Sequence, residues 1–367
     1  MKFGIQREAL LRPLQAVGGV VERKQTMPIL ANILLTVSPR SLALTGTDLE
    51  LELVTHVALE EEAEEGRVTV PARKLTDIVR ALPEGAEIRF EQDGEKMVVR
   101  SGRSRFTLAT LPASEFPAME TREEATGLQV PQGHLKGLLD RTAFAMAQQD
   151  VRYYLNGLLL EVADHTLRSV ATDGHRLALC ENGTEHDPEG GIQAIVPRKA
   201  VTELVKLLSE EEELVGIEAG GSYLRFRLAD TGFTTKLIDG RFPDYEQVIP
   251  SGNRHHLKAD RRLLRETLQR AAILSNEKYR GIRLQVRPGE VSAVAHNPEQ
   301  EEAEATLEVD YDGPEMEIGF NASYLLDALG ALDTEQARLQ LADSNSSCLI
   351  DGGEEGDCKY VVMPMRI

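Results

Sequence analysis

One stretch of sequence occurs three times. VPARKLTDIVRAL at residues 70–82 returns as VPRKAVTELVKLL at residues 196–208, and a more distant copy, FNASYLLDALGAL, occupies residues 320–332. Each copy has apolar residues at helical spacing, and each has one acid at the same place: Asp77, Glu203 and Asp327. An acid early in a helix is favoured by the helix dipole. The spacing of about 125 residues predicts three helices in three related units.

The flanking sequence repeats as well. Another helical segment precedes each copy (REALLRPLQAVGGVV, HLKGLLDRTAFAMA and DRRLLRETLQRAAIL), and it continues into a short strand (LANILLTV, LNGLLLEV and YRGIRLQV). Alternating stretches such as LRFRL follow each copy and are typical of half-buried antiparallel strands. We therefore predict an α+β fold of three tandem copies of a two-helix plus antiparallel-sheet domain, at 1–122, 127–250 and 254–367. Three unrelated domains with helices that match by chance remain the alternative.

Length and composition limit the class of protein. The chain has 367 residues, 41% of them hydrophobic and 28% charged, which is ordinary for globular domains. No apolar run reaches the roughly 18 residues of a membrane span, and charges come too early for a signal peptide. The three cysteines, Cys180, Cys348 and Cys358, show no metal-binding spacing. We expect reduced thiols in a cytoplasmic protein, with no metal and no cofactor.

Charge is distributed unevenly along the chain. The net charge is -19, but the six predicted helical segments sum to +8, which leaves -27 for the remainder. We expect the acidic runs, such as EEEAEE from Glu60 and EEEE from Glu210, to lie in loops that connect strands. Basic helices and acidic connections occur on many solvated surfaces. With a threefold repeat, however, they also fit a protein that encloses DNA weakly and without reading sequence, closed by head-to-tail pairing of two chains.

Six strings spread over the chain make the prediction specific. In chain order, QQDVRYYLNG (148–157), ATDGHRLA (171–178), RFPDYEQVIP (241–250), ILSNEKYRGIRL (273–284), DSNSS (343–347) and YVVMPMRI (360–367) resemble the bacterial DNA polymerase III beta subunit, the DNA sliding clamp. The resemblance implies a head-to-tail homodimeric ring with helices inside and sheets outside. It implies a processivity factor that encircles duplex DNA and tethers the replicative polymerase, with the clamp loader, other polymerases and repair factors as further partners.

In that family a short apolar peptide of each partner enters one cleft per subunit. The resemblance places the cleft at Leu155, Thr172, Gly174, His175, Arg176, Leu177, Pro243, Val248, Asn321, Tyr324, Ser347, Val361, Val362, Met363, Pro364, Met365 and Arg366. Flexible, polarizable methionines suit a site that accommodates different peptides. From the residues alone, YVVMPMRI also fits a last strand with a frayed end. Gln247, Asn345 and Ile367 depart from the Arg, Val and Leu of the best-known members, which puts fine peptide preference in doubt.

The family's other contacts carry over in the same way. DNA contacts are implied at Lys24, Arg73, Gln149, Tyr153 and Tyr154, and further ones at Arg80, Arg198 and Lys199. Exposed tyrosines can stack on bases, but half-buried loop tyrosines that only pack are an equal alternative. Subunit contacts are implied at Lys74, Ile78, Leu82, Phe106 and Leu108 against Ile273 and Leu274. Because RFTLATL alternates, it predicts an apolar edge strand, covered either by another chain or by the chain's own helix.

Two other function classes fit parts of the sequence. Asp173 and His175 in TDGH offer a carboxylate near an imidazole, as in acid–base catalysis, but no nucleophile, phosphate-binding or zinc motif accompanies them. We therefore expect no catalytic residue. An acidic multidomain scaffold that binds partner peptides without encircling DNA also fits the charge. Retention on circular against linear DNA separates the scaffold from the clamp.

Overall fold

The computed structural model describes residues 1–22, 27–119, 126–185, 188, 190–209 and 211–366. The order strand, helix, four strands, helix, three strands occurs three times along the chain, apart from short extra elements. The predicted class, three tandem α+β copies, is confirmed. Contacts between residues group the chain into two compact units, residues 1–133 with 202–237, and residues 134–201 with 238–367. The central copy is divided between these units because each of its two sheets continues into a neighbouring copy.

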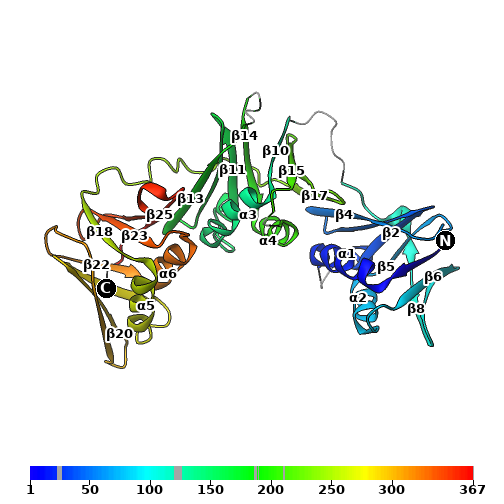
Figure 1. Ribbon diagram of the computed structural model, residues 1–367, viewed down its shortest axis with the longest axis horizontal. Helices are drawn as coiled ribbons and strands as arrows, with labels where there is room; N and C mark the ends of the chain where they lie inside the picture. The colour runs from blue at the N-terminus through cyan, green and yellow to red at the C-terminus, as the bar shows by residue number, and fades with distance from the viewer. Residues whose placement is uncertain (23–26, 120–125, 186–187, 189, 210, 367) are drawn as a thin grey trace. The chain divides into compact units, whose positions relative to one another are not determined.

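The first unit holds two antiparallel sheets, in the strand orders β1-β6-β7-β8 and β10-β15-β16-β17-β4-β3-β2-β5-β9. Helices α1 and α2 pack against each other, and α1 also packs on β3 and β4 (Figure 1). The elements are β1 Lys2–Gln6, α1 Arg7–Val20, η1 Pro28–Ala31, β2 Asn32–Ser38, β3 Ser41–Thr47, β4 Leu51–Ala58, β5 Gly66–Pro71, α2 Ala72–Ala81, β6 Glu87–Asp93, β7 Lys96–Ser101, β8 Ser104–Ala109, β9 Leu111–Pro112, η2 Ala113–Glu115, β10 Thr126–Pro131, β15 Leu214–Ala219, β16 Tyr223–Arg227 and β17 Thr231–Lys236.

The second unit also holds two antiparallel sheets, in the orders β14-β11-β12-β13-β25-β24-β23-β18 and β21-β20-β19-β22. Helices α5 and α6 pack against each other (Figure 1). The elements are η3 Ala143–Ala145, η4 Tyr153–Leu155, β11 Gly157–Ala163, β12 Thr166–Thr172, β13 Arg176–Gly183, β14 Ile192–Pro197, β18 His255–Asp260, α5 Arg261–Ala272, β19 Gly281–Arg287, β20 Glu290–His296, β21 Glu302–Glu308, β22 Met316–Asn321, α6 Ala322–Ala331, β23 Gln336–Leu341, β24 Cys348–Asp351, η5 Gly353–Glu355 and β25 Cys358–Val362. Helices α3 Gln132–Asp140 and α4 Arg198–Leu207 cross the division between the units.

The three repeated stretches are helices α2, α4 and α6, as predicted. Their inward residues are almost fully buried, among them Leu75, Leu204 and Leu325. Helix α3 is shorter than the pattern predicts. It ends at Asp140, and Thr142 turns inward, where its hydroxyl donates to the Leu138 carbonyl at 2.7 Å and contacts the Ser169 hydroxyl at 2.6 Å. The chain then continues as the short η3.

Neighbouring copies join through the same type of seam. Strand β17, the last of the central copy, pairs antiparallel with β4 of the first copy. Strand β25, the last of the third copy, pairs antiparallel with β13 of the central copy. Both β4 and β13 are the third strand after the first helix of their copy. The sheets are therefore continuous from copy to copy. Strand β8 corresponds to β17 and β25, and β21 corresponds to β4 and β13, but β8 and β21 each lie at an edge of their sheets.

The cysteine prediction was wrong for two of three residues. Cys180 on β13 and Cys358 on β25 lie directly opposite each other, with 4.1 Å between their Cα atoms, and form a disulfide. The sequence separation of 178 residues gave no sign of this pairing. Only Cys348 is a free thiol, and burial raises its pKa.

Candidate functional site

A tight turn between β12 and β13 carries five of the predicted cleft residues at or beside it. The Asp173 carboxylate accepts hydrogen bonds from the backbone N–H groups of His175 (2.9 Å) and Arg176 (3.1 Å). The Thr172 hydroxyl donates to the Arg176 carbonyl at 2.6 Å and accepts from the Gly174 N–H at 3.1 Å. Gly174 has a φ of +86°, and a Cβ there would lie 2.9 Å from the Arg152 guanidinium. This position therefore requires glycine, and His175 is held exposed at the tip of the turn.

The C-terminal segment lies beside this turn. Arg176 is opposite Val362, and Leu177 is opposite Val361. Beyond the strand, the Met363 N–H donates to the His175 carbonyl at 3.0 Å, and the Met365 N–H donates to the Gly319 carbonyl at 2.8 Å. Val361 and Val362 are buried and Met363 is exposed. The segment is thus an ordered extension of β25 between the turn and β22, in contrast to the frayed end that was the alternative.

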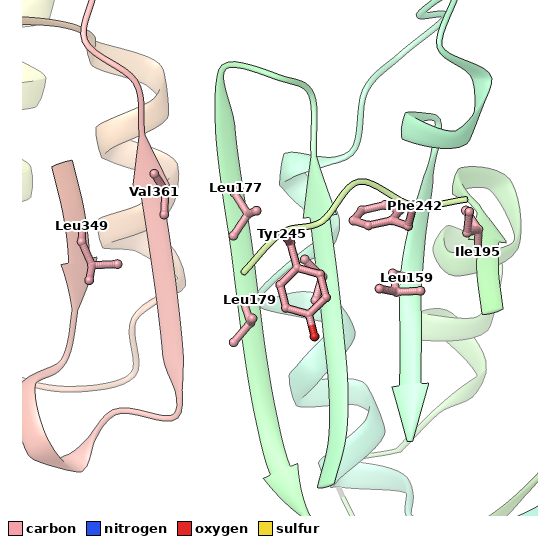
Figure 2. Packing of buried hydrophobic residues seen from close by; sticks show 9 residues of the cluster. Leu159, Leu177, Leu179, Ile195, Phe242, Tyr245, Leu349 and Val361 are labelled. Carbon is pink, nitrogen blue, oxygen red and sulfur yellow. The ribbon is translucent and has the colours of Figure 1, made fainter. Parts of the chain in front are cut away.

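Residues 239–250 form a third part of the site, which we call the crossing segment. Its Phe242 and Tyr245 are buried in one apolar cluster with Leu159, Leu177, Leu179, Ile195, Leu349 and Val361. Figure 2 shows both rings on the segment as it crosses the sheet, with Leu349 and Val361 on the neighbouring strands. Val248 packs against the same cluster. Because the cluster draws on β11, β13, β24 and β25, it anchors the crossing segment to the strands of two copies.

A polar contact fixes the crossing segment at its middle. The Tyr245 hydroxyl donates to the Glu161 carboxylate at 2.7 Å, and Gln193 donates to the same carboxylate at 2.9 Å. Arg168 lies between Glu161 and Glu181, with its Nη1 3.5 Å from Glu161 Oε2 and its Nε 2.7 Å from Glu181 Oε2. Burial alone would raise the pKa of Glu161, but the hydrogen bonds from Tyr245 and Gln193 and the charge of Arg168 lower it. Burial and the bond to Glu161 raise the pKa of Tyr245, which keeps its hydroxyl protonated as the donor.

Asn321, the last residue of β22, and Tyr324 of α6 lie at the start of helix α6. The Asn321 side chain caps the helix by accepting from the Ser323 N–H at 2.9 Å. The Tyr324 ring lies 4.5 Å from the central carbon of the Arg176 guanidinium. Leu155 is buried in η4, and the Ser347 carbonyl accepts from Asn253 at 2.9 Å just before β24. Pro243 and Pro364 are half-buried, and Arg366 is exposed.

Most of the predicted cleft residues thus fall on four neighbouring parts of one unit: the turn with the start of β13, the end of β25 with its extension, the crossing segment and the start of α6. We call this set the peptide site. Leu155 in η4 and Ser347 before β24 lie outside these four parts. Direct contacts join His175 to Met363, Arg176 to Val362 and Tyr324, and Leu177 to Val361. None of these direct contacts involves Leu155, Pro243, Ser347 or Arg366.

The geometry does not assemble the acid–base pair that the sequence suggested. The Asp173 carboxylate is occupied by two backbone N–H groups and by Arg176 Nε at 3.2 Å. Among the described hydrogen bonds, none joins it to the His175 ring. Within the described ranges there is also no group of three or more His, Cys, Asp or Glu side chains suited to a metal.

Comparison with known proteins agrees with the resemblance. Three models of the DNA polymerase III beta subunit match the chain: the N-terminal domain at residues 1–120, the central domain at 129–244 and the C-terminal domain at 246–366. The beta sliding clamp of Pseudomonas putida is 56% identical over 367 residues, and that of Escherichia coli K12 is 51% identical over 368, with full coverage of both chains in each case. The crystal structure of a DNA polymerase sliding clamp from Pseudomonas aeruginosa with ligand covers the whole chain, at 55% identity and a TM-score of 0.97.

The chain belongs to the DNA polymerase III beta subunit family. Full-length matches to proteins named beta sliding clamp identify its function class.

The residues implied to contact DNA in this family differ in exposure. Arg73 and Arg80 on α2 have side chains that are 82% and 59% exposed, and both lie near Asp77, at 3.8 Å and 3.7 Å. Gln149 and Tyr153 are exposed, whereas Tyr154 packs beside the apolar cluster. Arg198 and Lys199, at the start of α4, are half-buried, and Arg198 donates to the Met146 carbonyl at 3.0 Å. Lys24 lies outside the described residues.

The residues implied at the family's subunit contact also divide into two kinds. Ile273 is 74% exposed, Lys74 is exposed, and Ile78, Phe106 and Leu274 are half-buried. Leu82 and Leu108 are already buried within the chain. Coverage by the chain itself, the alternative for the β8 edge, therefore accounts for Leu108 on that strand but leaves Phe106 half-buried. In the described helices, none has the length and apolar character to cross a bilayer.

Proposed function

We propose that two copies of this chain pair head to tail into a closed ring around duplex DNA, and that the ring tethers polymerases and repair factors as a non-catalytic processivity subunit. The observation that carries the proposal is the repeated seam. Within the chain, β4 pairs with β17 and β13 pairs with β25. The corresponding strands at the two ends of the repeat are β21 and β8, and each lies at an edge of its sheet without a further described strand beside it.

The internal seams also suggest a register for the proposed one. Phe233 of β17 is opposite Leu53 of β4, and Tyr360 of β25 is opposite Ala178 of β13. Strands β4, β13 and β21 can be aligned through the hairpin that each forms with the strand before it. The pairs nearest the hairpin turn are Thr47 with Glu52, Thr172 with Leu177, and His296 with Glu302, so Glu52, Leu177 and Glu302 are equivalent positions. This alignment places Ala303 at the position of Leu53 and Ala178. Since Phe106 aligns with Phe233 and Tyr360, we expect Phe106 of one subunit opposite Ala303 of the other.

Charge supports the pairing of these two edges. Strand β8 and the turn before it expose Arg103 and Arg105, and β21 exposes Glu302, Glu304 and Glu308. Opposite charges on facing strands attract, and they also speed association. The exposed Ile273 adds an apolar contact of the kind that a subunit interface buries.

The peptide site supports the tethering role. It combines an exposed methionine, an exposed histidine and half-buried Pro243 and Val248, next to a tyrosine. A short extended peptide with apolar anchors is the kind of ligand that such a surface can hold. A labelled pentapeptide of the QLxLF type should bind saturably, and His175→Ala and Met363→Ala should each weaken it. A folded wild-type protein without measurable binding would place partner recognition elsewhere.

Retention on DNA tests enclosure directly. Once a clamp loader has placed it on a nicked circular plasmid, the protein should stay bound at high salt and should be lost when the plasmid is cut once. Weak electrostatic contact with phosphates alone would be salt-sensitive on both forms. Equal, salt-sensitive binding to circular and linear DNA would contradict enclosure, and an acidic scaffold that never encircles DNA predicts no retention on either form.

A further inference from the structure

Arg176 is the most highly connected side chain of the peptide site. Its Nε donates to Asp173 at 3.2 Å, its Nη2 donates to the Phe144 carbonyl at 2.8 Å, and its Nη1 donates to Asp327. Each of the three guanidinium nitrogens therefore has an acceptor within the chain. The side chain is only 13% exposed. A cation satisfied in this way is poorly placed to serve as a free charged contact for a ligand.

Two aromatic rings complete the environment of this guanidinium. Its central carbon lies 5.2 Å from the centre of the Phe144 ring and 4.5 Å from that of Tyr324. Phe144 belongs to η3 of the central copy, whereas Tyr324 and Asp327 belong to α6 of the third copy. Arg176 itself begins β13, directly after the turn that carries His175. The guanidinium thus joins one half of the peptide site to the other, with planar stacking that a lysine would not reproduce.

We propose that Arg176 and Asp327 act together as a positioning strut, which sets the spacing between the turn at Thr172–Arg176 and the residues Asn321 and Tyr324 at the start of α6. Neither the family models nor the resemblance assigns a role to Asp327. The inference rests on the proposed peptide site and adds a residue that shapes that site without touching the ligand. When the strut is removed, α6 and the turn lose their fixed separation, and peptide affinity falls while the fold persists.

A matched control is available in the same pair of copies. Asp333, just after α6, pairs with Arg141 of the central copy at 2.8 Å, and its side chain is 65% exposed. Neither Arg141 nor Asp333 belongs to the peptide site. Asp327→Ala and Asp333→Ala each remove one ion pair between the third and central copies, but only the first removes a partner of Arg176. Alanine is a good helix former, so Asp327→Ala leaves the propensity of α6 intact.

The experiment measures anisotropy of the labelled pentapeptide with wild type, Asp327→Ala, Asp333→Ala and Asp327→Glu, alongside thermal unfolding of each. We expect Asp327→Ala to weaken binding roughly 3- to 30-fold, Asp333→Ala to change it by less than about twofold, and Asp327→Glu to recover part of the loss. Unchanged affinity in Asp327→Ala, or an equal loss in both alanine variants, overturns the strut while leaving the peptide site in place.

Amide hydrogen exchange gives a second measurement that needs no peptide. In Asp327→Ala the amides of residues 174–176 and of Met363 and Met365 should exchange faster than in wild type, whereas Asp333→Ala should leave them unchanged. Identical exchange in the two variants contradicts the strut. If the wild type binds no peptide, both the strut's role and the proposed peptide site fail. Peptide binding with no selective effect of Asp327→Ala refutes the strut alone.

Discussion

Ile273→Ala should break the proposed ring while leaving each subunit folded. The substitution removes three side-chain carbons, and burying each is worth about 0.8 kcal/mol, or about 2.4 kcal/mol together. Because 74% of Ile273 is exposed in the single chain, about 1.8 kcal/mol of this depends on a second chain. A head-to-tail dimer contains two identical seams, so the loss is about 3.6 kcal/mol, which is roughly a 400-fold increase in the dimer Kd.

Sedimentation equilibrium or mass photometry over a dilution series measures that constant. Val151→Ala is the control, because Val151 is 94% exposed and lies outside the proposed seam; its dimer Kd should match that of wild type. Circular dichroism of dilute, monomeric Ile273→Ala should be the same as that of dilute wild type. A dimer Kd within about threefold of wild type would refute the placement of Ile273 at the seam.

Three further predictions follow from named contacts. Ser104→Cys combined with Ala305→Cys should give a dimer joined by disulfides on a non-reducing gel. The proposed register puts these two residues opposite each other across the seam, as Cys358 and Cys180 are within the chain. Ser104→Cys alone should give no disulfide-linked dimer. Glu161→Gln should lose less stability than wild type on acidification from about pH 5 to pH 3. The fold lowers the pKa of the Glu161 carboxyl, so the charged group stabilises the folded state above its pKa in the unfolded chain, and this contribution is lost as the pH falls through its pKa in the folded state. Equal losses of unfolding free energy for the two proteins in chemical denaturation would contradict this. Alkylation of protein unfolded without reductant should label Cys348 alone by mass spectrometry, and all three cysteines after reduction.

The helices were predictable because their signal is local. The stretch at residues 70–82 and its two copies carry helical periodicity, and the structure places α2, α4 and α6 within them. The early end of α3 was not predictable in this way. It depends on the contact of Thr142 with Ser169 of β12, which is a tertiary contact that no window of sequence contains. The disulfide between Cys180 and Cys358 is hidden for the same reason, since the register of two distant strands brings the pair together.

The proposed peptide site comes only from the resemblance to a family. Residue patterns alone left YVVMPMRI as an ordinary last strand. The roles of Asp327, Phe144 and Tyr245 were missed altogether. The repeated acids Asp77, Glu203 and Asp327 were a partial signal, because they mark one helix position, but the sequence does not show their different partners. Asp77 lies near two exposed arginines, and Asp327 forms an ion pair with Arg176. The Glu203 carboxylate lies so close to Gly19 that a Cβ on residue 19 would clash with it.

The charges on the edge strands β8 and β21 also favour some pairings between chains over others. One edge carries arginines and the other carries glutamates, so an edge meeting its own kind brings like charges together. Pairings of β8 with β8, or of β21 with β21, are disfavoured, and the chain acquires a polarity that a symmetric edge would lack. A closed pair would use both of these edges and would leave neither of them free for a third chain. If one seam of the proposed ring opened, it would free one arginine-bearing edge and one glutamate-bearing edge, which attract each other and so favour closing the same seam again.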